Sequence, residues 1–260
     1  MNTDQQKVTE QYSKISQHYN DWFSSPWPEP ARVQGKEIDA IFRSFSLPDT
    51  CRVLDLTCGI GTQSTGLAML GHNVTGIDIS EGQITKAREE AKNIDPDLPV
   101  HFTVGDASEP QKYTDGPFDV VISFGNSLPL LGSASAVSRS MAGMQRLLKE
   151  GGLLLVSMRD HSDLRARKPY LMGSGRLNNG KRQGVWIETG EWLDDGVRYI
   201  SHVIFVLTQP EHEEHHYPFP PLAALTPDEF LSILRQEGYE NLKMEQSSAF
   251  SFPVFSGRKQ

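Results

Sequence analysis

The segment from Arg52 to Thr62 limits what this chain can fold into more than any other part of it. A short run of leucine and β-branched residues carries an acidic residue, Asp55, and is followed by a Gly-x-Gly turn at Gly59 and Gly61. This order is typical of the first strand, turn and helix of a doubly wound parallel sheet, in which backbone comes close to a ligand. Glycine permits that approach because it has no Cβ atom and adopts turn dihedrals that other residues avoid.

Strand-like apolar runs alternate with helical periods along the first 160 residues. Strands are predicted at 52–56, 73–78, 100–105, 118–124 and 153–158, and helices at 1–23, 31–45, 81–93 and 134–149. This alternation predicts an α/β fold with a doubly wound, mostly parallel Rossmann-like sheet that has helices on both faces.

The pattern changes after residue 160. A loop rich in Gly, Asn and Lys is predicted at 173–184, and a β-hairpin turns at 193–196. Thr226 begins a capping box, so a helix starts there, and antiparallel closing strands follow at 241–246 and 252–255. We therefore predict three parts: an N-terminal helical cap at 1–50, a core at 51–160 and 219–260, and a β-hairpin lid or substrate insertion at 161–218.

Composition favours a small-molecule partner in the cytoplasm. The net charge is -8 and Lys and Arg are not clustered, which disfavours nucleic acid because phosphate neutralisation supplies much of that affinity. No run approaches the roughly 18 apolar residues of a membrane-spanning helix, and the polar N-terminus lacks a signal-peptide core. The expectation is a soluble, cytoplasmic protein without membrane or nucleic-acid partners, and a homo-oligomer is compatible with the sequence.

Acidic residues lie at or near the ends of the first three predicted strands, at Asp55, Asp78 and Asp106. Carboxyl ends of parallel strands share one edge of the sheet, which is where ligands bind in such folds. A dinucleotide enzyme would use the glycine turn and Asp78, but its fingerprint needs Gly or Ala where this chain has Ser64. Asp106 has no role in a dinucleotide site but suits an adenine amino group. A nicotinamide enzyme remains the alternative interpretation of this sheet edge.

The same motifs resemble those of class I S-adenosylmethionine-dependent methyltransferases over about residues 10–160. They are Asp55-x-x-x-Gly59-x-Gly61, Asp78, Gly105-Asp106-Ala107, Phe118-Asp119-Val120-Val121 and Gly151-Gly152. The resemblance implies S-adenosyl-L-methionine as cofactor. It implies cofactor contacts from Tyr19, Arg32, Asp55, Gly59, Gly61, Asp78, Ile79, Asp106, Ala107 and Phe124.

Individual roles follow from that resemblance. Asp78 would accept hydrogen bonds from the ribose hydroxyls, and Asp106 would accept one from the adenine amino group. The Phe124 carbonyl would face the cofactor ammonium, and Arg32 its carboxylate. The aromatic side chain of Tyr19 could close over the cofactor.

Two further motifs are similar to those of glycine and sarcosine N-methyltransferases. Gly125-Asn126-Ser127 follows the fourth strand, and Arg159-Asp160-His161 follows the fifth. This resemblance implies that Arg159 binds a substrate carboxylate and that Asn126 orients the substrate. The chain departs from that family in lacking a histidine shortly after Ser127 and in carrying Asp160-His161 where the family has Asn-Tyr.

The run His212-Glu213-Glu214-His215-His216 matches the zinc-protease pattern His-Glu-x-x-His, which works only on a helix. Pro210 and Pro218 bracket it, so a chance match is the better interpretation and no metal site is predicted. A neighbour, Tyr217, is a candidate for the substrate pocket.

These observations predict an S-adenosylmethionine-dependent methyltransferase. Its predicted acceptor is the amino group of a small carboxylate-bearing molecule such as glycine or sarcosine, with Asn126, Arg159 and Tyr217 as catalytic-site residues. The alternatives are an O- or C-methyltransferase of a secondary metabolite, and a catalytically silent module that binds S-adenosylmethionine.

Overall fold

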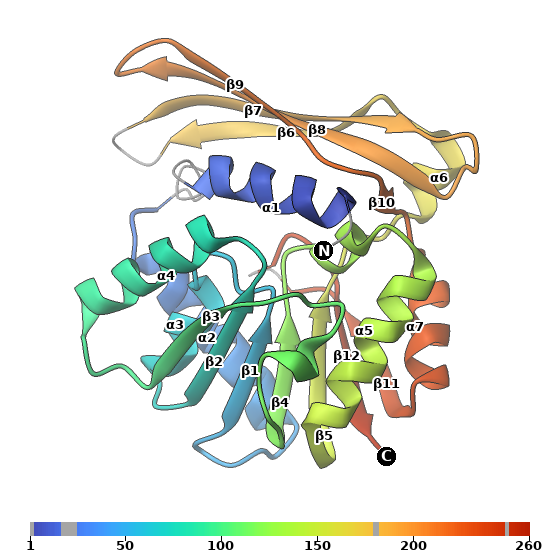
Figure 1. Cartoon of the computed structure of the whole chain (residues 1–260). Helices are drawn as coiled ribbons and strands as arrows, with labels where there is room; N and C mark the ends of the chain where they lie inside the picture. Colours follow the sequence, from blue (N-terminus) through green and yellow to red (C-terminus); the bar gives the residue numbers. More distant parts are fainter. Residues whose placement is uncertain (1–2, 17–24, 179–181, 248–249) are drawn as a thin grey trace.

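The computed structural model of the 260-residue chain contains two β-sheets and the helices that pack on them (Figure 1). It describes residues 3–16, 25–178, 182–247 and 250–260. Among these residues, every helix is too short or too polar to cross a bilayer.

The larger sheet has seven strands in the order β11-β12-β5-β4-β1-β2-β3. Its strands are β1 (Arg52–Leu56), β2 (Asn73–Asp78), β3 (Val100–Val104), β4 (Phe118–Ser123), β5 (Leu148–Ser157), β11 (Tyr239–Glu245) and β12 (Val254–Lys259). All run parallel except β12, which is antiparallel to both of its neighbours. The predicted doubly wound sheet with antiparallel closure is therefore confirmed.

Helices cover both faces of this sheet because the strands are apolar on both sides. They are α2 (Glu29–Ser44), α3 (Thr62–Ala68), α4 (Glu81–Ile94), α5 (Ala134–Leu147) and α7 (Pro227–Gln236). α2 and α3 pack very closely, since a Cβ atom added at Gly66 would lie 2.1 Å from the Ala31 carbonyl oxygen. The capping box predicted at Thr226 and Glu229 is present at the start of α7.

The second sheet, called the outer sheet below, consists of β6 (Leu171–Asn178), β7 (Gln183–Trp192), β8 (Arg198–Gln209), β9 (Glu213–Pro218) and β10 (Leu222–Ala223). The predicted hairpin corresponds to β7 and β8, which pair antiparallel. The short helix α6 (Ser162–Arg167) connects the end of β5 to this sheet.

The prediction of a loop at 173–184 is wrong, because β6 occupies its first half, up to Asn178, and β7 begins at Gln183. Cβ atoms at Gly173 and Gly175 would lie 3.2 and 2.5 Å from the Trp186 ring on the neighbouring strand. These glycines therefore make room for an indole in a strand and do not mark a turn.

Helix α1 (Thr3–Ile15) lies between the outer sheet and the larger sheet with its helices (Figure 1). Its Ile15 side chain is buried in the cluster that also holds Tyr199, Phe205 and Tyr217 of the outer sheet. The helix predicted at 1–23 is thus found as far as Ile15, and residues 17–24 lie outside the described part.

The His-Glu-x-x-His run forms no helix in the structure. Residues 213–218 are strand β9, paired with β8. Because successive side chains in a strand point to opposite faces, the helical face that a zinc protease needs is not formed there.

Candidate active site

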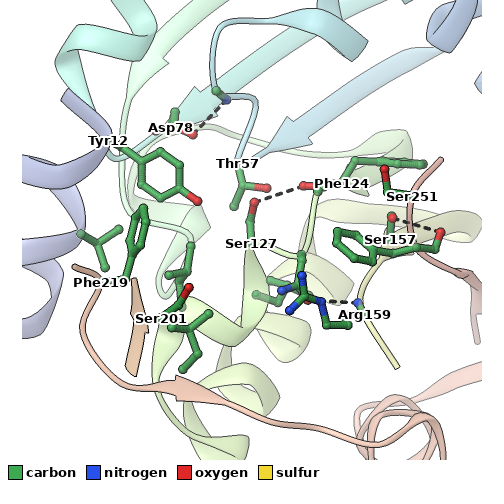
Figure 2. Close-up of a pocket in the computed structure, with 18 of the residues that line it drawn as sticks. Tyr12, Thr57, Asp78, Phe124, Ser127, Ser157, Arg159, Ser201, Phe219 and Ser251 are labelled. Atoms are coloured by element: carbon green, nitrogen blue, oxygen red, sulfur yellow. Dashed lines mark hydrogen bonds between the residues drawn. The ribbon is translucent and has the colours of Figure 1, made fainter. Parts of the chain in front are cut away.

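A cavity of about 760 Å³ lies at the carboxyl ends of the parallel strands and extends to the outer sheet (Figure 2). Eight of the predicted site residues line it: Gly59, Asp78, Ile79, Asp106, Ala107, Phe124, Asn126 and Arg159. A cavity at this edge is what the topology of an open α/β sheet provides.

Asp78 is fixed at the end of β2 by backbone donors. Its Oδ2 accepts a hydrogen bond from the Gly59 amide at 2.9 Å, and its Oδ1 accepts one from the Ser80 amide at 2.9 Å. Burial raises the pKa of this carboxyl, although the backbone donors oppose that shift. A carboxylate has about four acceptor positions, so Asp78 can still accept hydrogen bonds from a ligand.

Asp106 follows β3 in the same way. Its Oδ1 accepts a hydrogen bond from the Ser108 amide at 2.8 Å, which orients the side chain locally. Phe124 directly follows β4, and its carbonyl oxygen accepts a hydrogen bond from Ser127 Oγ at 3.1 Å (Figure 2). Three strand ends thus present oxygen acceptors to one cavity.

Asp55 and Gly61 do not line this cavity, although both were predicted to contact the cofactor. Asp55 is buried beneath the turn, where its Oδ2 accepts a hydrogen bond from Ser64 Oγ at 2.6 Å and its Oδ1 has no partner. Burial, with a smaller contribution from Asp78, raises the pKa of Asp55 to about 7. Gly61 has φ of 80° and packs on Phe102, so both residues shape the turn from below.

Three other predicted site residues are not found in the cavity lining: two lie elsewhere in the structure, and one lies outside the described residues. Arg32 is half exposed on α2, where it lies 3.9 Å from Glu29, and it does not line the cavity. Tyr217 is buried against Phe205 in the core of the outer sheet and does not line the cavity, because its strand turns that side chain toward α1. Tyr19 lies outside the described residues.

Arg159 lines the cavity but is already paired with a carboxylate. Its Nη2 lies 2.7 Å from Glu188 Oε2 and its Nη1 lies 3.3 Å from Glu188 Oε1, a two-point contact. Glu188 also accepts a hydrogen bond from Ser201 Oγ at 3.0 Å. The backbone amide of Arg159 donates to Asn126 Oδ1 at 3.0 Å (Figure 2), so the two predicted substrate residues are joined.

A buried chain of hydrogen bonds lies close to Arg159. His161 Nδ1 donates to the Leu225 carbonyl at 3.1 Å, which leaves Nε2 to accept from the Tyr199 hydroxyl at 3.3 Å. Burial and the nearby Arg159 charge lower the pKa of His161 to about 4, so its ring is neutral. Burial raises the pKa of Tyr199, and the nearby Arg159 charge opposes that shift.

The part of the cavity beneath the outer sheet is mostly apolar. Its walls include Tyr12, Leu130, Met172, Trp186, Val203 and Phe219. Tyr12 of α1 and Phe219 lie side by side with ring centroids 5.2 Å apart (Figure 2). Sequence reasoning missed Glu188 and this wall; the alternation of Trp186 and Glu188 along one strand was the only local signal for them.

Comparison with known proteins identifies the class. Residues 47–190 match the methyltransferase domain family, so the chain belongs to that family. A demethylmenaquinone methyltransferase of Leptospira interrogans is 26% identical over 249 residues, which cover 91% of this chain and 86% of that protein. The Bacillus subtilis protein YqeM, named as a methyltransferase, is 37% identical over 125 residues, and the match covers 48% of each chain.

Solved structures agree with the fold. An amino pentose methyltransferase from Micromonospora echinaspora, solved with S-adenosylmethionine bound, superposes with a TM-score of 0.69 at 18% identity over 88% of this chain and 92% of the other. DesVI of Streptomyces venezuelae gives a TM-score of 0.72 at 18% identity over 90% and 93%. By family and fold the chain is a class I S-adenosylmethionine-dependent methyltransferase.

The cavity residues fit that cofactor. Asp78 keeps free acceptor positions for hydroxyls, and Asp106 stands at the adjacent strand end. Gly59 has φ of 55°, and an added Cβ atom there would meet only Gln83 Oε1, at 3.8 Å. The missing side chain at Gly59 therefore leaves space in the cavity, whereas at Gly61 it makes room for Phe102.

Proposed function

We propose that this chain transfers a methyl group from S-adenosylmethionine to a small molecule that has a largely apolar body and a polar group. The observation that carries the proposal is the cavity itself. It runs from Asp78 and Asp106 to the apolar wall of the outer sheet, and its volume falls in the usual range of ligand pockets, about 300–1,000 Å³. In this proposal the insertion at 161–218 is the acceptor-binding part.

Three residues at the strand ends would hold the cofactor. Asp78 would bind the ribose hydroxyls, Asp106 the adenine amino group and the Phe124 carbonyl the ammonium group. When bound, S-adenosylmethionine supplies an electrophilic methyl group attached to a positively charged sulfur. The contribution of this chain is mainly positioning, which can lower a barrier by about 7–11 kcal/mol when the reactants are held in line.

The residues beneath the outer sheet would hold the acceptor. Tyr12 and Phe219 offer aromatic surface, and α1 with the outer sheet excludes water from that side. Asn126 holds the backbone of Arg159 and so fixes the polar end of this compartment.

The finer prediction of a glycine- or sarcosine-like acceptor depends on an Arg159 that is free to bind a carboxylate. Glu188 already occupies both guanidinium edges that face it, so a substrate carboxylate would have to displace it. The relatives support a larger acceptor: one is named for demethylmenaquinone and one structural neighbour for an amino pentose. We therefore favour methylation of a larger metabolite, at oxygen or carbon as in the predicted alternative, or at nitrogen.

An acceptor screen tests this proposal. The protein is incubated with S-adenosylmethionine and, separately, with a hydroquinone, an aromatic alcohol, an amino sugar, glycine and sarcosine, and S-adenosylhomocysteine is measured by mass spectrometry. We expect product with a larger acceptor and none with glycine or sarcosine. Product with glycine that Arg159→Ala abolishes through a higher KM would restore the amino-acid prediction.

Calorimetry with S-adenosylmethionine separates the remaining alternative. Cofactor binding without product for every acceptor would favour a catalytically silent module.

A further inference from the structure

We infer that Glu188 and Arg159 together form a recognition pair that selects an uncharged hydroxyl group on the acceptor. This inference rests on the proposed function and assigns the chemistry of the acceptor's polar end. It makes Glu188 a specificity-determining residue.

The pair lies where an acceptor would meet it. Both residues line the cavity, and their side chains are only 15% and 12% exposed. Arg159 follows β5 of the larger sheet and Glu188 lies on β7 of the outer sheet, so the pair joins the two sheets at one wall. Trp186, two residues before Glu188 on the same face of β7, also lines the cavity.

Several contacts hold the pair in place. Ser201 donates to Glu188 Oε1, Asn126 accepts from the Arg159 amide, and the guanidinium lies 5.2 Å from the centre of the Phe252 ring. Since these contacts come from three different segments, the pair is preorganised. A ligand therefore meets a fixed donor and a fixed acceptor.

The charges of the pair decide what it can bind. The two ions together carry no net charge, and their surroundings are poorly hydrated. An acceptor carboxylate would approach Glu188, and an acceptor ammonium would approach Arg159; either would place like charges together in a low-dielectric cavity. A hydroxyl both donates and accepts, so it can donate to Glu188 and accept from Arg159 without adding charge.

Two fluorescent probes with one ring system test the inference. At pH 7, 2-naphthol is neutral and carries a hydroxyl, whereas 2-naphthoate carries a carboxylate. Their dissociation constants are measured by fluorescence titration on the full chain saturated with S-adenosylhomocysteine, so no turnover occurs. We expect the wild-type protein to bind 2-naphthol at least about tenfold more tightly, which corresponds to about 1.4 kcal/mol.

Glu188→Gln provides the decisive variant, because it keeps the shape of the side chain and leaves the Arg159 charge uncompensated. The ratio of the two dissociation constants should move at least about tenfold toward 2-naphthoate. Ser201→Ala, which removes one contact to Glu188, should move it in the same direction by about two- to fivefold, or about 0.4–1 kcal/mol. Glu191→Gln is the matched control, because Glu191 is exposed on the same strand and does not line the cavity, and it should leave the ratio unchanged.

Three results would overturn the inference: a wild-type preference for 2-naphthoate, no binding of either probe, or a ratio that Glu188→Gln does not change. Failure of the proposed function has a different signature. In that case S-adenosylhomocysteine itself would not bind in calorimetry, whatever the probes do.

Discussion

The two halves of the cavity are built in different ways. In the half at the strand ends, each acidic side chain is held by backbone amides close to it in the sequence or in the adjacent turn, as Asp78 is by Gly59 and Ser80. In the half beneath the outer sheet, the polar groups are held by side chains from distant segments, as Arg159 is by Glu188. Under the proposed function, the first half would hold the cofactor through local backbone geometry. In the second half, substitution of single residues of the outer sheet would change the acceptor specificity.

The largest effect is expected at the strand ends. Asp78→Ala should weaken binding of S-adenosylhomocysteine by about 100- to 1000-fold, because it removes a charged acceptor of ligand hydroxyls and leaves the Gly59 amide unpaired. Isothermal calorimetry measures the change, and circular dichroism checks folding. Asp97→Asn, at an exposed carboxylate after α4, is the control. An affinity within threefold of wild type would show that Asp78 does not hold the cofactor.

The next effect is on the free energy of unfolding, and it concerns the cavity half beneath the outer sheet. Arg159→Met leaves Glu188 buried without its partner and should lower the free energy of unfolding by about 3 kcal/mol. The double variant Arg159→Met/Glu188→Leu should recover more than half of that loss, since it removes both charges. Urea denaturation measures both variants. A double variant less stable than the single one would contradict the expected dependence of each charge on the other.

A smaller difference in stability is expected between alanine variants of two glycines that have similar φ angles. Gly61 and Gly71 have φ of 80° and 91°, but an added Cβ atom would lie 2.7 Å from Phe102 at Gly61 and would meet nothing within 4 Å at Gly71. Gly71→Ala should cost about 1 kcal/mol from backbone strain alone, and Gly61→Ala about 2–3 kcal/mol. Equal losses in thermal denaturation would mean that Gly61 is needed only for its dihedral angles.

The last effect is a pH dependence at Asp55. Its pKa is about 7 in the folded chain and close to 3.8 when unfolded, so the folded state binds more protons between these values. Stability should therefore fall as pH rises from about 4 to 7. Asp55→Asn keeps an acceptor for Ser64 and should remove this decline, which gives the variant a relative gain of about 3–4 kcal/mol at pH 8 over pH 4. Parallel urea curves at both pH values test it, and a constant difference between the proteins would refute it.

The contrast between the two halves also explains what the sequence could predict. The first four strand ends, the glycine turn and the Thr226 capping box have local signals, and β1 to β4 and that helix were predicted at nearly their observed bounds. The strand predicted at 153–158 begins earlier, at Leu148, and the one predicted at 252–255 is found at 254–259. Strand β6 was missed because Gly173 and Gly175 make sense only beneath Trp186 of another strand. Glu188 was missed for the same reason, since its partner Arg159 is 29 residues away and lies just after β5 of the larger sheet.

The predicted site residues that do not line the cavity reflect the same limit. Arg32 and Tyr217 have suitable chemistry, but their positions on helix α2 and strand β9 leave them outside the cavity lining. Asp55 stands in the right motif, yet Ser64 and the turn above keep it out of the cavity.

A crystal structure of the chain with S-adenosylhomocysteine is the most direct measurement. We expect the adenosine between Asp78 and Asp106, with the Arg159–Glu188 pair intact and the apolar compartment beneath the outer sheet left open for an acceptor. Adenosine bound at any other surface, or a ligand carboxylate replacing Glu188 on Arg159, would contradict the division of the cavity into a cofactor half and an acceptor half.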